Sequence, residues 1–319
     1  MASIESATIP VGRYAPSPTG RMHFGNIFTA VLSWLSVRSR KGKWVLRIED
    51  LDPQRSKTEY AKIIEDDLDW LGLDWDEGGT EGKGSHGPYC QSMRHDVYEA
   101  ALDKLAARKV IYPCFCRRAD ILATQAPHAS DGRVVYSGRC RPLATPPFDV
   151  TFEKGFGATR LYVPDEDIVF VDGICGRQCV NLARHCGDFL LRRADGAWSY
   201  QLAVVADDAS MRITEVLRGN DLLLSAAQQI YLYNLLGYDS PEFLHTPLIC
   251  NASGTRLSKR DTSMSMEVLR RRYTPDMILG KIACAAGLAD TGDSCSLSDL
   301  LSIYNRDRIT RSPHVVVEL

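Results

Sequence analysis

The sequence lacks the features that mark membrane and secreted proteins. No uninterrupted apolar run approaches the roughly 20 residues that a membrane span requires. The first ten residues, MASIESATIP, have neither the basic start nor the apolar centre of an export signal. We therefore expect a cytoplasmic protein with no membrane partner. Its 319 residues, 45% of them hydrophobic and 24% charged, are sufficient for two domains.

The chain also lacks a strong net charge, internal repeats and low-complexity tracts. A formal net charge of −2 excludes the overall basic field typical of many nucleic-acid-binding proteins. Local basic clusters at 37–43 (VRSRKGK) and 270–272 (RRR) are typical of solvated surfaces. The ten cysteines occur without an export signal, which favours free thiols or metal ligands over a disulfide framework.

The first half of the chain alternates strand and helix patterns. Short apolar runs predict strands at 11–15 and 44–49, and apolar residues at helical spacing predict helices at 27–40, 55–73 and 94–110. This order predicts parallel strands joined by right-handed crossovers, and therefore an α/β protein. The Gly-rich segment 76–87 predicts a surface loop.

Beyond Cys114 the pattern changes to shorter strands. Residues 189–204 predict a β-hairpin, because Asp195-Gly196 is a strong turn signal. We expect a Rossmann-like core interrupted by an inserted domain. The expected units are the first half of the core at 1–108, the insertion at 109–195, the second half of the core at 196–260 and a short helical region at 261–319.

Two loops contain groups suited to phosphate binding. In RYAPSPTGRMHFGN, prolines and glycines shape a turn that brings His23, Gly25 and Asn26 to a helix start, where backbone N–H groups favour anions. A lone histidine there is usually a helix cap. Together with the lysine of RLSKR at 256–260, the pattern becomes more specific, because these groups can converge on the phosphates of ATP without a Walker lysine.

The strings RYAPSPTGRMHFGN, LRIEDLDPQR, SYQLAVVADD, RITEVLRGNDLL and RLSKR, in this order, resemble the class I aminoacyl-tRNA synthetases of the glutamyl type. HFGN corresponds to the first class I signature and RLSKR to the second, with Lys259 retained and Arg256, Leu257 and Arg260 departing from the usual KMSKS. The resemblance implies a Rossmann-like catalytic core, an inserted zinc-binding α+β domain and a short helical C-terminal extension.

The resemblance also implies a glutamate pocket and an ATP site. Glutamate has two carboxylates and one ammonium, so its pocket requires guanidinium groups and an acid. By resemblance Arg13 and Arg218 bind the carboxylates and Glu49 the ammonium, although taken alone Glu49 suits a salt bridge with Arg47 and Arg218 a surface position. Asp52, Asp207 and Asp208 are interpreted as loop and supporting acids. The implied glutamate-binding set is Arg13, Tyr14, Ala15, Pro16, Ser17, Glu49, Tyr200 and Arg218. The implied ATP-binding set is His23, Gly25, Asn26 and Lys259, and Mg²⁺ accompanies ATP. Of these residues, His23, Asn26 and Lys259 are implied to be catalytic.

The length of the C-terminal region selects a branch of the family. Only residues 261–319 follow RLSKR, and a helical anticodon-binding domain does not fit there. The truncated relatives are the glutamyl-queuosine tRNA(Asp) synthetases, which attach glutamate to the modified base queuosine in the anticodon loop. The resemblance thus implies ATP, L-glutamate and the queuosine-bearing anticodon loop of tRNA(Asp) as partners.

A metal-ligand pattern resembles the same branch. Cys114, Cys116, Tyr136 and Cys140 resemble its C-x-C…Y-x-x-x-C set, which implies one structural Zn²⁺. A phenol is the weakest of these ligands, and His128 is the alternative. A rival group, formed by Cys175, Cys179, His185 and Cys186, is interpreted as buried small residues without metal.

Three alternative functions remain open. A shortened glutamyl-tRNA synthetase would charge the 3′ end of tRNA. A small nucleotidyltransferase would share the HFGN-type loop without needing the LRIEDLD segment of the glutamate pocket. A non-catalytic, synthetase-derived RNA-binding module would be expected to have degraded ATP motifs, whereas both motifs are retained here.

Overall fold

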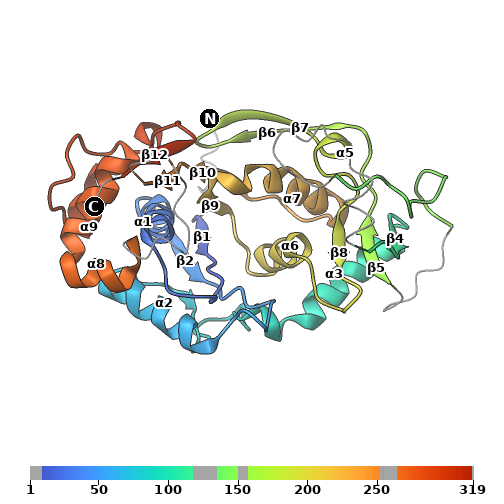
Figure 1. The fold of residues 1–319 in the computed structure, drawn as a ribbon, viewed down its shortest axis with the longest axis horizontal. Helices are drawn as coiled ribbons and strands as arrows, with labels where there is room; N and C mark the ends of the chain where they lie inside the picture. Colours follow the sequence, from blue (N-terminus) through green and yellow to red (C-terminus); the bar gives the residue numbers. More distant parts are fainter. Residues whose placement is uncertain (1–8, 118–134, 150–156, 252–253, 255–263, 318–319) are drawn as a thin grey trace, which may run out of the picture.

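The computed structural model describes residues 9–117, 135–149, 157–251, 254 and 264–317, and its core is a five-stranded parallel sheet (Figure 1). The strand order is β10-β9-β1-β2-β3. Trp44, Val45 and Leu46 are all buried, as expected for a parallel sheet covered on both faces. The strands are β1 (Val11–Tyr14), β2 (Lys43–Leu46), β3 (Glu77–Gly78), β9 (Glu215–Gly219) and β10 (Glu242–Thr246).

Helices cover both faces of this sheet because successive strand residues point to opposite sides. Leu217 packs into the cluster on the side of α1, and its neighbour Val216 packs into the cluster on the side of α3, α6 and α7. The expected α/β core is thus confirmed. The helices are α1 (Phe24–Arg38), α2 (Thr58–Trp70), α3 (His95–Ala107), α6 (Tyr200–Ser210), α7 (Leu223–Leu236), α8 (Met266–Arg272), α9 (Pro275–Ala286) and α10 (Leu297–Ile303), with short 3₁₀ turns at Gln91–Met93, Asn220–Leu222 and Arg306–Arg308.

The central strand β1 lies at the point where the strand order reverses. It pairs in parallel with β2 on one side and with β9 on the other. In open parallel sheets, ligands bind outside the carboxyl ends of the strands at such a switch point. The loops after Tyr14 and Gly219 therefore mark the expected position of the site.

The described residues of the segment from 111 to 192 form smaller sheets beside the core (Figure 1). Strand β5 pairs antiparallel with both β4 and β8, and a separate hairpin, β6–β7, packs against α7 and β10. A parallel pair, β11–β12, joins the segment after β10 to residues 314–316. The elements are β4 (Ile111–Cys114), β5 (Ala158–Leu161), β6 (Asp167–Asp172), β7 (Gly176–Asn181), α5 (Leu182–His185), β8 (Leu190–Arg192), β11 (Leu248–Cys250) and β12 (His314–Val316).

The predicted hairpin at 189–204 is wrong in its second arm. Only an isolated bridge between Arg192 and Trp198 follows the turn, and α6 begins at Tyr200. The Ser199 side chain accepts a hydrogen bond from the Leu202 backbone N–H, which caps the helix and stops the strand. The predicted loop at 76–87 likewise contains the short edge strand β3.

None of the helices in the described residues combines the length and the apolar character needed to cross a bilayer.

Candidate active site

A cleft of about 930 Å³ opens at the carboxyl ends of β1 and β9, where the strand order reverses. Its walls come from segments far apart in the sequence: the loop after β1, the start of α1, the loop after β2, the start of α6 and the end of β9. All the predicted glutamate- and ATP-binding residues in the described part of the chain line this cleft, namely Arg13, Tyr14, Ala15, Pro16, Ser17, His23, Gly25, Asn26, Glu49, Tyr200 and Arg218.

The first turn of α1 begins with a capping box formed by His23 and Asn26. His23 is the N-cap residue, and its Nδ1 accepts a hydrogen bond from the Gly25 N–H at 3.1 Å. The Asn26 Oδ1 accepts one from the His23 N–H at 3.0 Å, which completes a capping box. Because Nδ1 is an acceptor, the proton of the neutral imidazole is on Nε2. A Cβ at Gly25 would lie 3.2 Å from the His23 ring, so glycine suits this close approach.

Two buried arginines and one acid form part of the cleft wall. Arg13 and Arg218 are 4% and 5% exposed, and Glu49 follows β2. The backbone N–H of Glu49 donates to the Pro16 carbonyl at 3.0 Å, which joins the loops after β1 and β2. Burial lowers the pKa of Arg218, while the nearby Tyr200 opposes this shift. Two guanidinium groups and one carboxylate thus face a single cleft.

Two buried acids beneath this wall pair with Arg13 and with arginines behind it. Asp208 Oδ1 lies 2.5 Å from Arg47 Nη1 and 3.5 Å from Arg13 Nε. Asp207 Oδ1 accepts a hydrogen bond from Arg94 Nε at 2.5 Å. Burial raises the pKa of Asp207, and the charges of Arg47 and Arg94 act in the opposite direction. The interpretation of Asp207 and Asp208 as supporting acids agrees with these contacts.

Tyr14 has a packing role as well as a place in the cleft. Its ring stacks on Trp44 with 5.9 Å between centroids, and its hydroxyl donates to the Asn26 carbonyl at 3.3 Å. Burial, followed by the negative charge of Asp67, raises the pKa of the Tyr14 hydroxyl. Tyr14 therefore braces the first turn of α1 through Asn26.

Residues that sequence reasoning missed lie behind Arg218. Its Nε donates to His245 Nε2 at 3.0 Å, and His245 Nδ1 lies 2.6 Å from Asp172 Oδ2. A buried histidine at the carboxyl end of a strand is the only signal that the sequence offered, and Asp172 belongs to a hairpin distant in sequence. Arg47 was considered only as a salt-bridge partner of Glu49.

The RLSKR motif, including Lys259, lies outside the described residues. The chain that follows it returns to the first motif: Ser265 forms a bridge with His23, and the Met266 N–H donates to the Met22 carbonyl at 2.9 Å. Ile249, on β11 just before the motif, lines the cleft. The segments flanking both motifs therefore meet at one side of the cleft.

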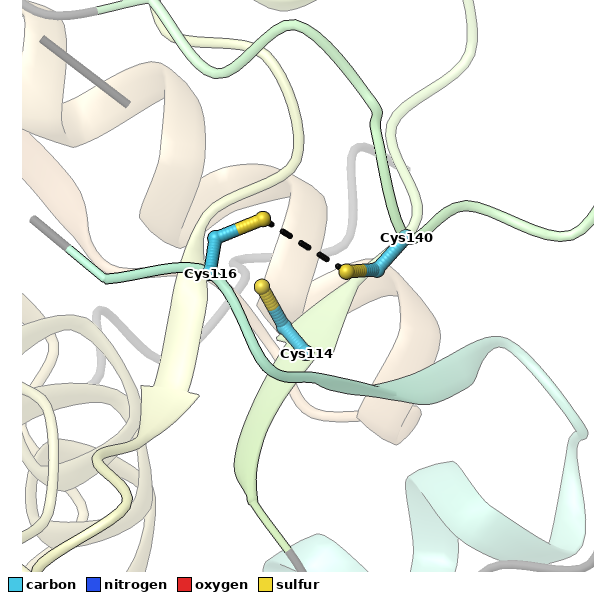
Figure 2. A group of neighbouring side chains, drawn as sticks. All are labelled: Cys114, Cys116 and Cys140. Carbon is cyan, nitrogen blue, oxygen red and sulfur yellow. Dashed lines mark hydrogen bonds between the residues drawn. The ribbon is translucent and has the colours of Figure 1, made fainter. Parts of the chain in front are cut away.

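Three predicted metal ligands converge near the end of β4 (Figure 2). The sulfur atoms of Cys114, Cys116 and Cys140 all lie within 4.8 Å of one another, and those of Cys116 and Cys140 are 3.5 Å apart. The Tyr136 hydroxyl is 3.5 Å from Cys114 Sγ and 3.8 Å from Cys116 Sγ. A tetrahedral zinc ion with three thiolates and one oxygen requires S···S separations of about 3.8 Å and S···O separations of about 3.5 Å. The residues present fit this ion.

The rival group is not brought together. Cys175 Sγ contacts the His245 carbonyl at 3.4 Å, Cys179 Sγ contacts Asp167 at 3.6 Å, and Cys186 Sγ contacts the Leu182 carbonyl at 3.3 Å. Within the residues that the structure describes, the three cysteines of Figure 2 are the only cluster of metal-ligating side chains. His128 lies outside those residues.

Comparisons with known proteins agree with this geometry. Residues 11–313 match the catalytic domain of the class I tRNA synthetases (E and Q). A glutamyl-Q tRNA(Asp) synthetase from Symbiobacterium thermophilum is 44% identical over 309 residues, which cover 95% of this chain and 94% of that protein. The corresponding protein of Nitratidesulfovibrio vulgaris is 45% identical over 280 residues, covering 87% of this chain and 86% of its own.

A solved structure resembles the whole fold. The crystal structure of a glutamate tRNA ligase from Elizabethkingia meningosepticum, in complex with its amino acid, superposes with a TM-score of 0.82 at 27% identity. The superposition covers 97% of this chain and 67% of that protein.

Proposed function

The chain belongs to the glutamyl-Q tRNA(Asp) synthetases, a branch of the class I tRNA synthetases for glutamate and glutamine, and from this we propose that its cleft activates L-glutamate with ATP and transfers the glutamyl group to queuosine in the anticodon loop of tRNA(Asp). The enzyme is of the ligase type, and class I synthetases use ATP with Mg²⁺. One observation carries the proposal: two arginines, a glutamate and the imidazole-capped start of α1 all line the same cleft.

The charges of the wall match the charges of glutamate. Arg13 and Arg218 bind the two carboxylates, since guanidinium groups form strong hydrogen bonds with carboxylates. Glu49 binds the ammonium, and the hydroxyls of Ser17 and Tyr200 add hydrogen bonds. Tyr14, Ala15 and Pro16 shape the turn beside the bound amino acid.

The phosphates of ATP bind at the start of α1. The Nε2–H of His23 and the side-chain NH₂ of Asn26 are the hydrogen-bond donors at this helix start, and Gly25 leaves room for the His23 ring. Lys259 adds a positive charge from the second motif. These groups stabilise the charge that develops on the phosphates, and no protein nucleophile is required.

The reaction proceeds in two steps. In the first, an oxygen of the glutamate α-carboxylate attacks the α-phosphorus of ATP, and the bond to pyrophosphate breaks. In the second, a hydroxyl of the queuosine cyclopentenediol attacks the acyl carbon, so that an ester forms, AMP leaves and the hydroxyl proton is released. Arg13, Arg218 and Glu49 serve both steps by holding the glutamyl group against the reacting atoms.

We further propose that Cys114, Cys116, Tyr136 and Cys140 hold one structural zinc ion. When bound, the ion would cross-link the end of β4 to the segment at 136–140. Arg160 lies beside the ligand set, with its Nε 3.2 Å from Cys114 Sγ and its guanidinium 3.6 Å from the centre of the Tyr136 ring. Its positive charge offsets the negative charge that three thiolates bring. In this arrangement 109–195 is the inserted zinc-binding domain, between catalytic halves at 1–108 and 196–260.

A second candidate is glutamylation of the 3′ end of tRNA, favoured by the likeness to a glutamate tRNA ligase. The two acceptors can be separated by incubating the protein with labelled glutamate and tRNA(Asp) that either contains or lacks queuosine. We expect label only on the queuosine-containing tRNA, and we expect it to stay there after the terminal adenosine is clipped off. Label that leaves with the adenosine would establish the 3′ end as the acceptor.

A further inference from the structure

A buried chain of hydrogen bonds ends at the arginine assigned to a substrate carboxylate. Asp172 lies at the end of β6, His245 on β10 and Arg218 on β9. The side chains of Asp172 and His245 are both 0% exposed, and Arg218 is 5% exposed. Successive donor–acceptor distances are 2.6 Å and 3.0 Å. The β6–β7 hairpin, which lies outside the central sheet, thus contacts the active-site wall through these side chains.

The position of each proton in this series of hydrogen bonds follows from the groups at its two ends, the Arg218 guanidinium and the Asp172 carboxylate. A guanidinium only donates, so His245 Nε2 must be the acceptor of the bond from Arg218 Nε. The imidazole proton is therefore on Nδ1 and is donated to Asp172 Oδ2. The other oxygen of Asp172 accepts the backbone N–H groups of Cys175, Ile174 and His245 at 2.8, 3.0 and 3.2 Å. Asp172 is thereby held as an acceptor that selects one tautomer of His245.

The orientation of the Arg218 guanidinium depends on that tautomer. Its Nε is fixed by His245, and its Nη2 donates to the Leu222 carbonyl at 3.3 Å. Its Nη1 is buried and has no hydrogen-bond partner among the described residues. Arg218 lines the cleft, and a small movement of its neighbours would open Nη1 to a bound carboxylate, which would supply the acceptor that this donor lacks.

We propose that Asp172 and His245 are positioning residues for glutamate binding: Asp172 holds the His245 tautomer that accepts from Arg218, and this contact aims the guanidinium at a substrate carboxylate. The inference rests on the proposed glutamate pocket. It assigns to the β6–β7 hairpin a direct part in the affinity for the amino acid.

The most direct test is Asp172→Asn. The asparagine oxygen can still accept the backbone N–H groups, but its NH₂ group must donate to His245 Nδ1, which moves the imidazole proton to Nε2, opposite the Arg218 Nε–H. Losing a hydrogen bond to a charged group corresponds to a rise in KM for glutamate on the order of 10- to 100-fold. In glutamate-dependent ATP–pyrophosphate exchange, kcat and the KM for ATP should stay within about twofold of wild type.

Two further variants separate positioning from a general loss of structure. Asp167→Asn makes the same change at the opposite, exposed end of β6 and should leave the KM for glutamate unchanged. His245→Gln keeps an oxygen near the position of Nε2 to accept from Arg218. Adding Asp172→Asn to His245→Gln should then raise KM little, because glutamine has no imidazole tautomer to select.

The outcomes are distinguishable. An unchanged KM in Asp172→Asn, an equal loss in Asp167→Asn, or independent additive losses in the double variant would overturn the inference. If Asp172→Asn does not fold, His245→Leu supplies the test by raising KM where His245→Gln does not, and equal KM values would count against the proposal. Wild-type protein that shows neither exchange with glutamate nor a glutamate-induced rise in Tm would refute the pocket itself.

Discussion

The Nη2 atom of Arg47 lies 3.1 Å from the Oε1 atom of Glu49, and the two side chains are 0% and 9% exposed. Burial raises the pKa of Glu49, and the positive charges of Arg47 and Arg13 limit this rise. The carboxylate proposed to bind the substrate ammonium is therefore held in position by an arginine beneath the cleft, and it depends on that arginine for its charge.

Glu49→Gln should weaken glutamate activation because an amide has no charge to offer an ammonium. We expect kcat/KM for glutamate in pyrophosphate exchange to fall on the order of 10- to 100-fold. Glu59→Gln, on the exposed face of α2, is the matched control and should leave it unchanged. Because the pKa of Glu49 is raised, wild-type activity should fall on acidification at a higher pH than that of an ordinary glutamate. Equal activity of the two variants would remove Glu49 from the pocket.

The protein should activate glutamate in the absence of tRNA. All the described pocket residues belong to this chain, so ATP–pyrophosphate exchange requires only glutamate, ATP and Mg²⁺. The measurement is exchange with glutamate, aspartate or glutamine as the only amino acid. A preference for aspartate or glutamine would contradict the assignment of Arg13 and Arg218, and exchange that begins only when tRNA is added would contradict a complete pocket.

Lys259→Ala should slow adenylate formation far more than it weakens glutamate binding. A lysine that acts on the phosphates in the transition state contributes on the order of 10²-fold to the rate. The rate can be followed by single-turnover adenylate formation, and binding by the glutamate-induced shift in Tm. Lys62→Ala, on the exposed side of α2, removes the same charge elsewhere and should leave both the rate of adenylate formation and glutamate binding unchanged. A near-wild-type rate for Lys259→Ala would show that RLSKR is not catalytic.

Metal content should depend on one cysteine group and not on the other. Cys116→Ser and Cys140→Ser should lose the zinc ion, because each removes one of three thiolates within 4.8 Å. Cys175→Ser and Cys179→Ser, whose sulfur atoms contact separate partners, should retain it. Elemental analysis of the purified variants decides between the groups. Full zinc retention by Tyr136→Phe would reduce Tyr136 to a packing residue.

Acid should destabilise the fold through the pair formed by Asp172 and His245. Burial lowers the pKa of His245 despite the bond to Asp172, whereas for Asp172 burial is outweighed by the hydrogen bonds of His245 and the backbone, so that its pKa is also lowered. The unfolded chain then binds protons at a higher pH than the folded chain. Stability should fall as the pH drops below about 6.5 and further as Asp172 titrates. The measurement is the free energy of unfolding in urea at several pH values from 7 to 4. It should change less with pH in the double variant Asp172→Asn/His245→Gln than in the wild type.

The α/β core and the loop before α1 were predictable from the sequence because their signals are local, whereas the glutamate-binding part of the cleft followed only from the resemblance to a known family. Apolar runs mark β1 and β2, and the HFGN string marks the start of α1, where His23 proves to be the cap. The cysteines at 114, 116 and 140, which were expected from the resemblance to the family's ligand pattern, do converge.

Other features could not be predicted, since they depend on contacts between distant segments. The 199–204 segment reads as a strand until Ser199 caps a helix. His245 gains its partners only when β10 pairs with β9 and the β6–β7 hairpin packs against β10. No local pattern indicates which carboxylate meets a buried imidazole.

The central place of β1 in the sheet affects how the protein is made. While the chain emerges from the ribosome, β1 can pair with β2 early, but its other edge stays open until residues 215–219 have been synthesised. An unpaired strand edge in the middle of a future sheet favours association with other chains. We infer that the nascent protein is prone to aggregate until β9 has been synthesised and has paired with β1. Bound glutamate cannot protect the chain before then, because Arg218 is itself part of β9.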